Sequence, residues 1–356
     1  MIKVKAPGKL YIAGEYAVVE TGCPAILVGL NRYVYVSVED SENVGTIISR
    51  QYENSTVVWK RRGSEMVLDN RDNPFEYILS GIRITEQYAQ ECGRKMRCYN
   101  LKIDSELDSP NGKKYGLGSS AAVTVATVRA LCAYYRLDVS SDELFKLAAI
   151  AHFDVQGNGS LGDIATSVFG GWIEYHSFDR QWLKSARHSY TLGELLDRSW
   201  PGLQIKPLPS FDELNLVIGW TGSPASTSNL VDKVELSKEE RRKKYLAFVH
   251  ESSKCVEEME QAFQDHDLKT IQSRLRRNRE LLGNLHEITG VEIETPALKY
   301  LIESAEKAGG AAKTSGAGGG DCGIVLIDSS IDTSALLADW KQHGIIPLDL
   351  SVHYND

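Results

Sequence analysis

The sequence has no excess of positive charge and no long uncharged apolar run. Its 40 lysines and arginines are outnumbered by 48 aspartates and glutamates, which gives a formal net charge of −8. Electrostatic binding to nucleic acid needs a basic surface, so we expect no nucleic-acid partner. A membrane span needs roughly 18 consecutive apolar residues. No such run occurs, so we expect no membrane association.

Cysteine pairs at metal-binding spacing are also missing. The six cysteines are scattered and include no C-x-x-C pair, a pattern typical of reduced thiols rather than of disulfides or a zinc site. The eight histidines show no H-E-x-x-H spacing, so we predict no histidine metal centre. Residues 2–19 lack the basic, apolar and small-residue order of a secretory signal, and we expect a cytoplasmic protein.

Apolar periodicity predicts a β-rich beginning followed by buried helices. Residues 32–40 alternate, with Val34, Val36 and Val38 on one face, and residues 100–104 form a second expected strand. From Ser119 onwards the chain is apolar on nearly all sides, which predicts a buried central helix. The next helix should begin at a capping box made by residues 140 and 143.

The C-terminal part is expected to combine a helical hairpin with a small sheet. A strand at residues 214–220 precedes a second capping box, Ser237 and Glu240, and a long helix. We expect its apolar face to contain Leu246, Val249, Val256, Met259 and Phe263. A second helix, a helix begun by Thr295-Pro296, and strands at 322–328 and 345–353 follow. We place the domain boundary at residue 210, giving domains 1–210 and 211–356.

The stretch KYGLGSSAAV, residues 114–123, has the glycines of a phosphate-binding loop but lacks its lysine. Gly116 and Gly118 allow close approach to a ligand, and Ser119 and Ser120 fall in the first turn of the expected helix. Free N–H groups and the helix dipole attract anions at such an end. The alternative is a tight turn with serine caps.

Two further stretches have the composition of ligand-binding loops. In KTSGAGGGDCG, residues 313–323, four of the five residues 316–320 are glycine, which is costly in backbone entropy unless the loop is used. In APGKLYIAGEYAVV, residues 6–19, Lys9 and Glu15 flank a short strand. The alternatives are a flexible connection for the first and a solvated surface lysine for the second.

Together, P-G-K, G-L-G-S-S-A-A and K-T-S-G-A-G-G-G-D resemble, in this order, the motifs of the GHMP kinase superfamily. The stretches GNGSLGDIA and GWTGSPAS narrow the resemblance to phosphomevalonate kinases of Gram-positive bacteria. The resemblance implies an α+β fold of two domains, an N-terminal one with a left-handed βαβ unit and a ferredoxin-like C-terminal one. It also implies that ATP with Mg²⁺ binds between them and phosphorylates phosphomevalonate, in the mevalonate route to isoprenoids.

The resemblance also implies roles for individual residues. Lys9 and Asp163 would be catalytic, and Ser120 would bind Mg²⁺. The ATP phosphates would be bound by Lys114, Gly116, Leu117, Gly118, Ser119 and Ser120. The candidates for the substrate side are Glu15, Tyr16, Ser160, Ser223, Ser315 and Gly316. Asp154 and Gln156 are left open as a second metal ligand, and Lys113 and Lys313 are expected to add positive charge.

A phosphate acceptor changes the role expected of Asp163. The second pKa of a phosphate monoester is about 6, so the attacking oxygen is already ionised at neutral pH and needs no general base. We therefore expect Asp163 to orient Lys9 or Mg²⁺. Kinases of alcohols such as mevalonate or homoserine, and a non-catalytic ligand sensor, remain alternatives. The sequence leaves open whether the protein is a monomer or a homodimer.

Overall fold

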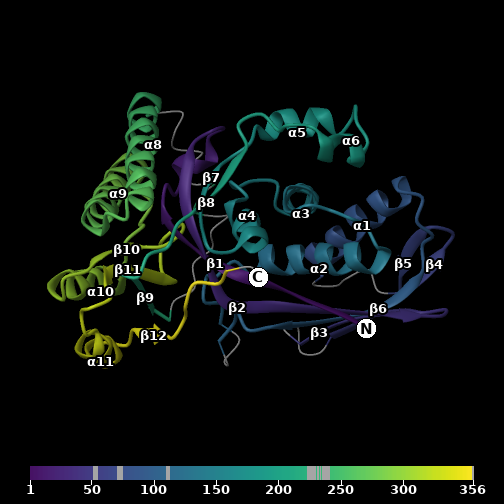
Figure 1. Cartoon of the computed structure of the whole chain (residues 1–356), viewed down its shortest axis with the longest axis horizontal. Coiled ribbons are helices and arrows are strands. Elements are labelled where there is room, and N and C mark those ends of the chain that lie inside the picture. The colour runs from purple at the N-terminus through teal and green to yellow at the C-terminus, as the bar shows by residue number, and fades with distance from the viewer. Residues whose placement is uncertain are drawn as a thin grey trace.

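The computed structural model describes residues 1–50, 55–69, 75–109, 113–222, 230, 232, 234 and 241–354. Within these residues the strands form two sheets (Figure 1). The first sheet contains β1 (Ile2–Ala13), β2 (Pro24–Ser41), β3 (Gly45–Ser49), β4 (Ser55–Arg62), β5 (Glu65–Leu68), β6 (Cys98–Ser105), β7 (Trp172–His176) and β8 (Gln204–Leu208). The second contains β9 (Leu214–Trp220), β10 (Ala311–Thr314), β11 (Cys322–Asp328) and β12 (Ile346–Leu348).

Helices cover one face of the first sheet and flank the second (Figure 1). Those of the N-terminal part are the 3₁₀ turn η1 (Ala17–Val19), α1 (Glu76–Glu91), α2 (Ser119–Tyr135), α3 (Ser141–Gln156), α4 (Gly162–Phe169), α5 (Arg180–Ala186) and α6 (Leu192–Asp197). Those of the C-terminal part are α8 (Arg242–Gln264), α9 (Leu268–Thr289), α10 (Pro296–Lys307) and α11 (Ser334–Gln342). No helix in the described ranges is long and apolar enough to cross a membrane.

Strand β2 is the long central strand of the first sheet, pairing with β1, β6 and β7. The predicted alternation is confirmed, because Val34, Val36 and Val38 are buried while Tyr33 and Tyr35 are partly exposed. Strands β3 and β6 pair in parallel, with α1 in the connection between them, as in a βαβ unit. The sheet therefore presents its apolar face to the helices.

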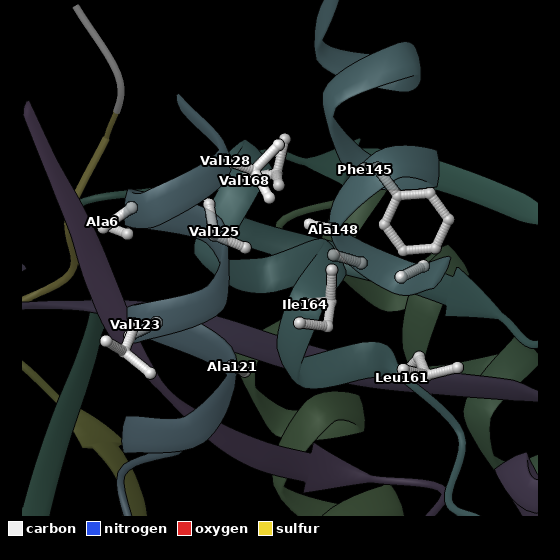
Figure 2. Packing of buried hydrophobic residues seen from close by; sticks show 14 of the residues in the cluster. Ala6, Ala121, Val123, Val125, Val128, Phe145, Ala148, Leu161, Ile164 and Val168 are labelled. Carbon is white, nitrogen blue, oxygen red and sulfur yellow. The ribbon is translucent and has the colours of Figure 1, made fainter. Parts of the chain in front are cut away.

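Helix α2 is buried on nearly every side, as its sequence predicts. Figure 2 shows its apolar side chains packed with those of β1, α3 and α4. The labelled members of this cluster are Ala6, Ala121, Val123, Val125, Val128, Phe145, Ala148, Leu161, Ile164 and Val168. The capping box of Ser140 and Glu143 at the start of α3 is confirmed. The packing of the residues that follow holds the first turn of α2 in place.

The second sheet has the strand order β10-β11-β9-β12, with antiparallel pairs throughout. This is the order of a ferredoxin-like βαββαβ arrangement. The chain leaves the first sheet at Leu208 and enters the second at Leu214. It returns to the first part near its end, where Val352 bridges to Leu30 and Tyr354 to Gly170. The boundary at residue 210 stays a prediction.

Several local expectations need correction. Helices α8 and α9 form the predicted hairpin, and Thr295 caps α10 as expected. Leu246, however, is 53% exposed, because the buried face of α8 runs instead through Tyr245 and Phe248. The last expected strand is shorter than residues 345–353, and α11 precedes it without having been predicted. The capping box of residues 237 and 240 lies outside the described residues.

A buried ion pair joins the turn after β1 to the second sheet. The Nζ atom of Lys313, on β10, lies 2.5 Å from Oε1 of Glu15, and both side chains are almost fully buried. Nζ also donates to the carbonyl of Thr314 at 2.6 Å, and Oε1 accepts from the N–H of Gly316 at 3.2 Å. Burial lowers the pKa of Lys313, and the Glu15 carboxylate opposes this effect. Each charge therefore depends on the other.

We predict that Lys313→Met lowers the free energy of unfolding by about 3–5 kcal/mol, because it leaves Glu15 buried without a counter-charge. The surface pair Lys299–Glu303 provides a matched control, since Lys299 is 64% exposed. Lys299→Met should cost at most about 0.5 kcal/mol. Urea unfolding measures both, and equal losses for the two variants would contradict the prediction.

Candidate active site

A cavity of about 430 Å³ lies where the three motif-bearing stretches meet. It is lined by most of the residues that the sequence singled out: Lys9, Glu15, Tyr16, Lys114, Gly116, Leu117, Gly118, Ser119, Ser120, Ser160, Asp163, Ser315 and Gly316. Ser223 lies outside the described residues. Segments more than 300 residues apart in sequence thus face one space, whose volume is typical of a small-molecule site.

The loop before α2 depends on its glycines. Gly116 and Gly118 have φ angles of 80° and 78°, in the left-handed region that disfavours side chains. A Cβ atom on Gly118 would lie 3.0 Å from Cε of Lys9, and one on Gly116 would lie 2.6 Å from the Asp321 carboxylate. Gly118 is the N-cap of α2, with no side-chain cap, so the serine-cap alternative is wrong. The first N–H groups of α2 remain available to an anion.

Lys9 supplies a full positive charge at this loop from another part of the chain. Its backbone N–H donates to the carbonyl of Leu117 at 2.9 Å, which ties β1 to the loop. Its Nζ atom donates to the carbonyl of Gly116 at 3.2 Å. Within the described part of the chain the Lys9 ammonium forms no ion pair with the Asp163 carboxylate. The lysine is instead fixed against the loop itself.

Asp163 enters the cavity from the first turn of α4. The helix begins after Leu161, whose φ of 66° turns the chain sharply. One carboxylate oxygen of Asp163 accepts from the N–H of Ile164 at 3.0 Å. Asp163 and Lys9 therefore line the same space from two different elements, each held by backbone contacts.

Sequence reasoning missed Tyr11, which lines the cavity from β1. Its hydroxyl lies 2.8 Å from Oγ of Ser160. Burial raises the pKa of Tyr11 far above its ordinary value, and the nearby Asp163 and Glu15 carboxylates raise it further. Tyr11 therefore stays protonated at neutral pH. The side chain follows Lys9 by two residues on a strand, and this same-face spacing was the signal available in the sequence.

The third motif closes the cavity through contacts with β1. The hydroxyl of Ser315 accepts from the N–H of Tyr11 at 2.9 Å and donates to its carbonyl at 2.8 Å. The Tyr16 hydroxyl donates to the carbonyl of Ala317 at 2.5 Å. Glu15 is engaged by Lys313, but its second oxygen is buried and has no partner among the described residues. This carboxylate therefore has one buried acceptor oxygen without a donor among the described residues.

Two of the expected extra cations do not serve this cavity. Lys313 is committed to Glu15, and the Nζ atom of Lys113 lies 3.5 Å from the carbonyl of Gly222 on the surface. Whether a lysine adds charge to the cavity depends on its burial and its local contacts, which composition does not reveal. Lys9 and Lys114 are the cationic side chains that line the cavity in the described ranges.

The structure distinguishes the two candidates for a second metal ligand, Asp154 and Gln156. Asp154 forms ion pairs with Arg83 and Arg187 and does not line the cavity. Gln156 does line it, with its amide directed to Asn158. Other lining residues had no predicted role: Tyr77, His152, Asn158 and Asp321.

Comparison with known proteins supports the predicted resemblance to GHMP kinases. Residues 76–171 match the N-terminal domain of GHMP kinases, and residues 259–346 match their C-terminal domain. The chain is 37% identical to the phosphomevalonate kinase of Streptomyces sp. (strain CL190), over 97% of this chain and 96% of that protein. It is 30% identical to the mevalonate kinase of Thermococcus gammatolerans, over 91% and 89% of the two chains.

A solved structure extends the likeness to the whole fold. The phosphomevalonate kinase of Streptococcus pneumoniae, in complex with phosphomevalonate and AMPPNP, is similar with a TM-score of 0.86. Its sequence is 30% identical, and the likeness covers 99% of this chain and all of that one. The expected two-domain α+β architecture is confirmed. By sequence and by fold, the chain belongs to the GHMP kinase family.

Proposed function

We propose that this protein transfers the γ-phosphoryl group of ATP to the phosphate of (R)-5-phosphomevalonate, giving ADP and 5-diphosphomevalonate. The observation that carries the proposal is the meeting of Lys9, Asp163 and the loop of residues 116–120 in one cavity closed by the third motif. The likeness to a phosphomevalonate kinase over nearly the whole chain supports this acceptor over an alcohol.

The nucleotide phosphates would bind at the start of α2. Backbone N–H groups and the helix dipole attract the phosphates there, and Lys114 and Lys9 add full charges beside them. Lysine binds phosphate as a compact point charge. Bound in this way, the γ-phosphoryl group would lie next to Lys9.

The residues present fit a magnesium ion. Mg²⁺ prefers oxygen ligands and is usually held by one or two protein oxygens together with substrate phosphates. Ser120 and Asp163 offer such oxygens in the cavity. No group of three or more histidine, cysteine or acidic side chains in the described ranges could hold a metal by itself. We assign Ser120 as a ligand. The ion, when bound, would neutralise phosphate charge.

Transfer breaks the bond from the γ-phosphorus to the β–γ bridging oxygen and forms one to an acceptor phosphate oxygen. The main obstacle is repulsion between two polyanions, which Lys9 would reduce while stabilising charge in the transition state. The acceptor oxygen is already ionised at neutral pH. Asp163 would therefore act by orienting the cations and not as a general base.

The substrate would occupy the side of the cavity formed by β1 and the third motif. Glu15 lines this side of the cavity and remains a proposed substrate contact. Tyr16, Ser160, Ser315 and Gly316 line the same side and remain proposed substrate contacts. Ser223 remains a proposal without a described position.

A coupled assay of ADP release tests the function directly. We expect turnover with ATP and phosphomevalonate, and turnover with mevalonate at least about a hundredfold slower in kcat/KM, because mevalonate lacks the phosphate that provides both the ionised acceptor oxygen and binding contacts. Turnover of mevalonate alone would support an alcohol kinase instead. Turnover of neither acceptor, with nucleotide bound, would support a ligand sensor.

The two candidate catalytic residues should differ in their effect. Lys9→Ala should lower kcat by about 10²–10³-fold, the usual loss for a preorganised charge-stabilising group. Asp163→Asn keeps the size of the side chain and should cost about tenfold or less at neutral pH, because no proton has to be removed. Steady-state kinetics of both folded variants decide the matter. A larger loss for Asp163→Asn would contradict the proposed division of roles.

A further inference from the structure

His152 lies on α3 beside the first turn of α2 and lines the cavity, although no motif includes it. Its side chain is almost fully buried, with 1% of its surface exposed. Its Nε2 atom lies 3.4 Å from Oγ of Ser120. Its ring stacks on Tyr77, with the centroids 4.8 Å apart and the planes at 28°. The imidazole thus stacks on Tyr77 and directs its Nε2 atom toward Ser120.

The imidazole of His152 has few possible hydrogen-bond partners. Burial lowers the pKa of His152, and the nearby Asp163 carboxylate opposes this effect. Its Nδ1 atom is buried and has no hydrogen-bond partner among the described residues. The Ser120 hydroxyl is therefore the side-chain partner of this imidazole. The 3.4 Å separation is long, and such contacts often shorten when a ligand is bound.

We propose that His152 is a positioning residue, which holds the Ser120 hydroxyl so that its oxygen faces a divalent cation on the bound nucleotide. This inference rests on the proposed use of a nucleotide and a metal, but not on the identity of the acceptor. In one tautomer Nε2 accepts the Ser120 proton, and in the other Nε2–H donates to the Ser120 oxygen. Both leave an oxygen lone pair for the cation.

The chemistry of metal sites gives this contact a purpose. A serine hydroxyl rotates freely and binds a cation weakly unless a neighbour fixes it, and such outer partners typically contribute 10–100-fold in metal affinity or activity. The stacked Tyr77 ring limits the rotation of His152, and the packed α2 fixes the backbone of Ser120. Packing in the core therefore limits the positions that the hydroxyl oxygen of Ser120 can take.

The test compares nucleotide binding with and without the metal. The dissociation constant of AMPPNP is measured by calorimetry in Mg²⁺ and in EDTA. His152→Phe keeps the ring but removes the hydrogen bond, and we expect about a tenfold or greater weakening in Mg²⁺ with a change below about twofold in EDTA. His152→Gln retains a polar atom near the position of Nε2 and should stay within about threefold of the parent protein.

A matched control and a double variant make the test decisive. His343 also stacks on a tyrosine, Tyr300, but lies outside the cavity, so His343→Phe should change neither constant. If His152 acts through Ser120, adding His152→Phe to Ser120→Ala should cause no further loss. Equal weakening in Mg²⁺ and EDTA, or additive losses in the double variant, would overturn the proposal. Failure to turn over phosphomevalonate would refute the proposed function and leave these binding results standing.

Discussion

The candidate site depends on the close contact between β1 and the loop before α2. The N–H of Lys9 donates to the carbonyl of Leu117, and a Cβ atom on Gly8 would lie 3.0 Å from that same carbonyl oxygen. Two backbones approach so closely here that only glycine fits at the crossing. The contact brings the Lys9 ammonium to a loop that has no lysine of its own. The positive charge of a phosphate loop is thus supplied by tertiary structure instead of by local sequence.

The rest of the fold holds this contact in place from both sides. On one side α2 is buried on nearly every face, so the loop at its start cannot shift without disturbing the core. On the other side the two hydrogen bonds of Ser315 fasten the third motif to β1, and the Lys313–Glu15 pair fastens it to the turn that follows β1. Two residues of β1 therefore contact the other two motifs: Lys9 contacts the loop before α2, and Tyr11 contacts the third motif. Rigid support of this kind is what a site that works by electrostatics requires.

The sequence reveals the elements whose pattern is strong. The alternation in β2 and the continuous apolar character of α2 were sufficient, because local periodicity reports burial. The strands β3 to β5 and the helices α5, α6 and α11 were not predicted, since their short apolar runs do not distinguish a strand from a helix. In the site, the loop glycines, Lys9 and Asp163 follow from ordered motifs. Contacts between distant segments do not: the burial of Lys313 and the approach of His152 to Ser120 exist only in the folded chain.

The central claim is that Lys9 stabilises the phosphoryl group in the transition state of its transfer. A crystal structure with Mg²⁺, ADP, phosphomevalonate and a planar aluminium fluoride in place of that group tests it most directly. The claim predicts that the Lys9 Nζ atom leaves the Gly116 carbonyl and lies at about 2.7–3.2 Å from a fluoride of the mimic, a normal charge-assisted contact. A structure in which Lys9 stays on the carbonyl, while the mimic is held by other groups, would contradict it.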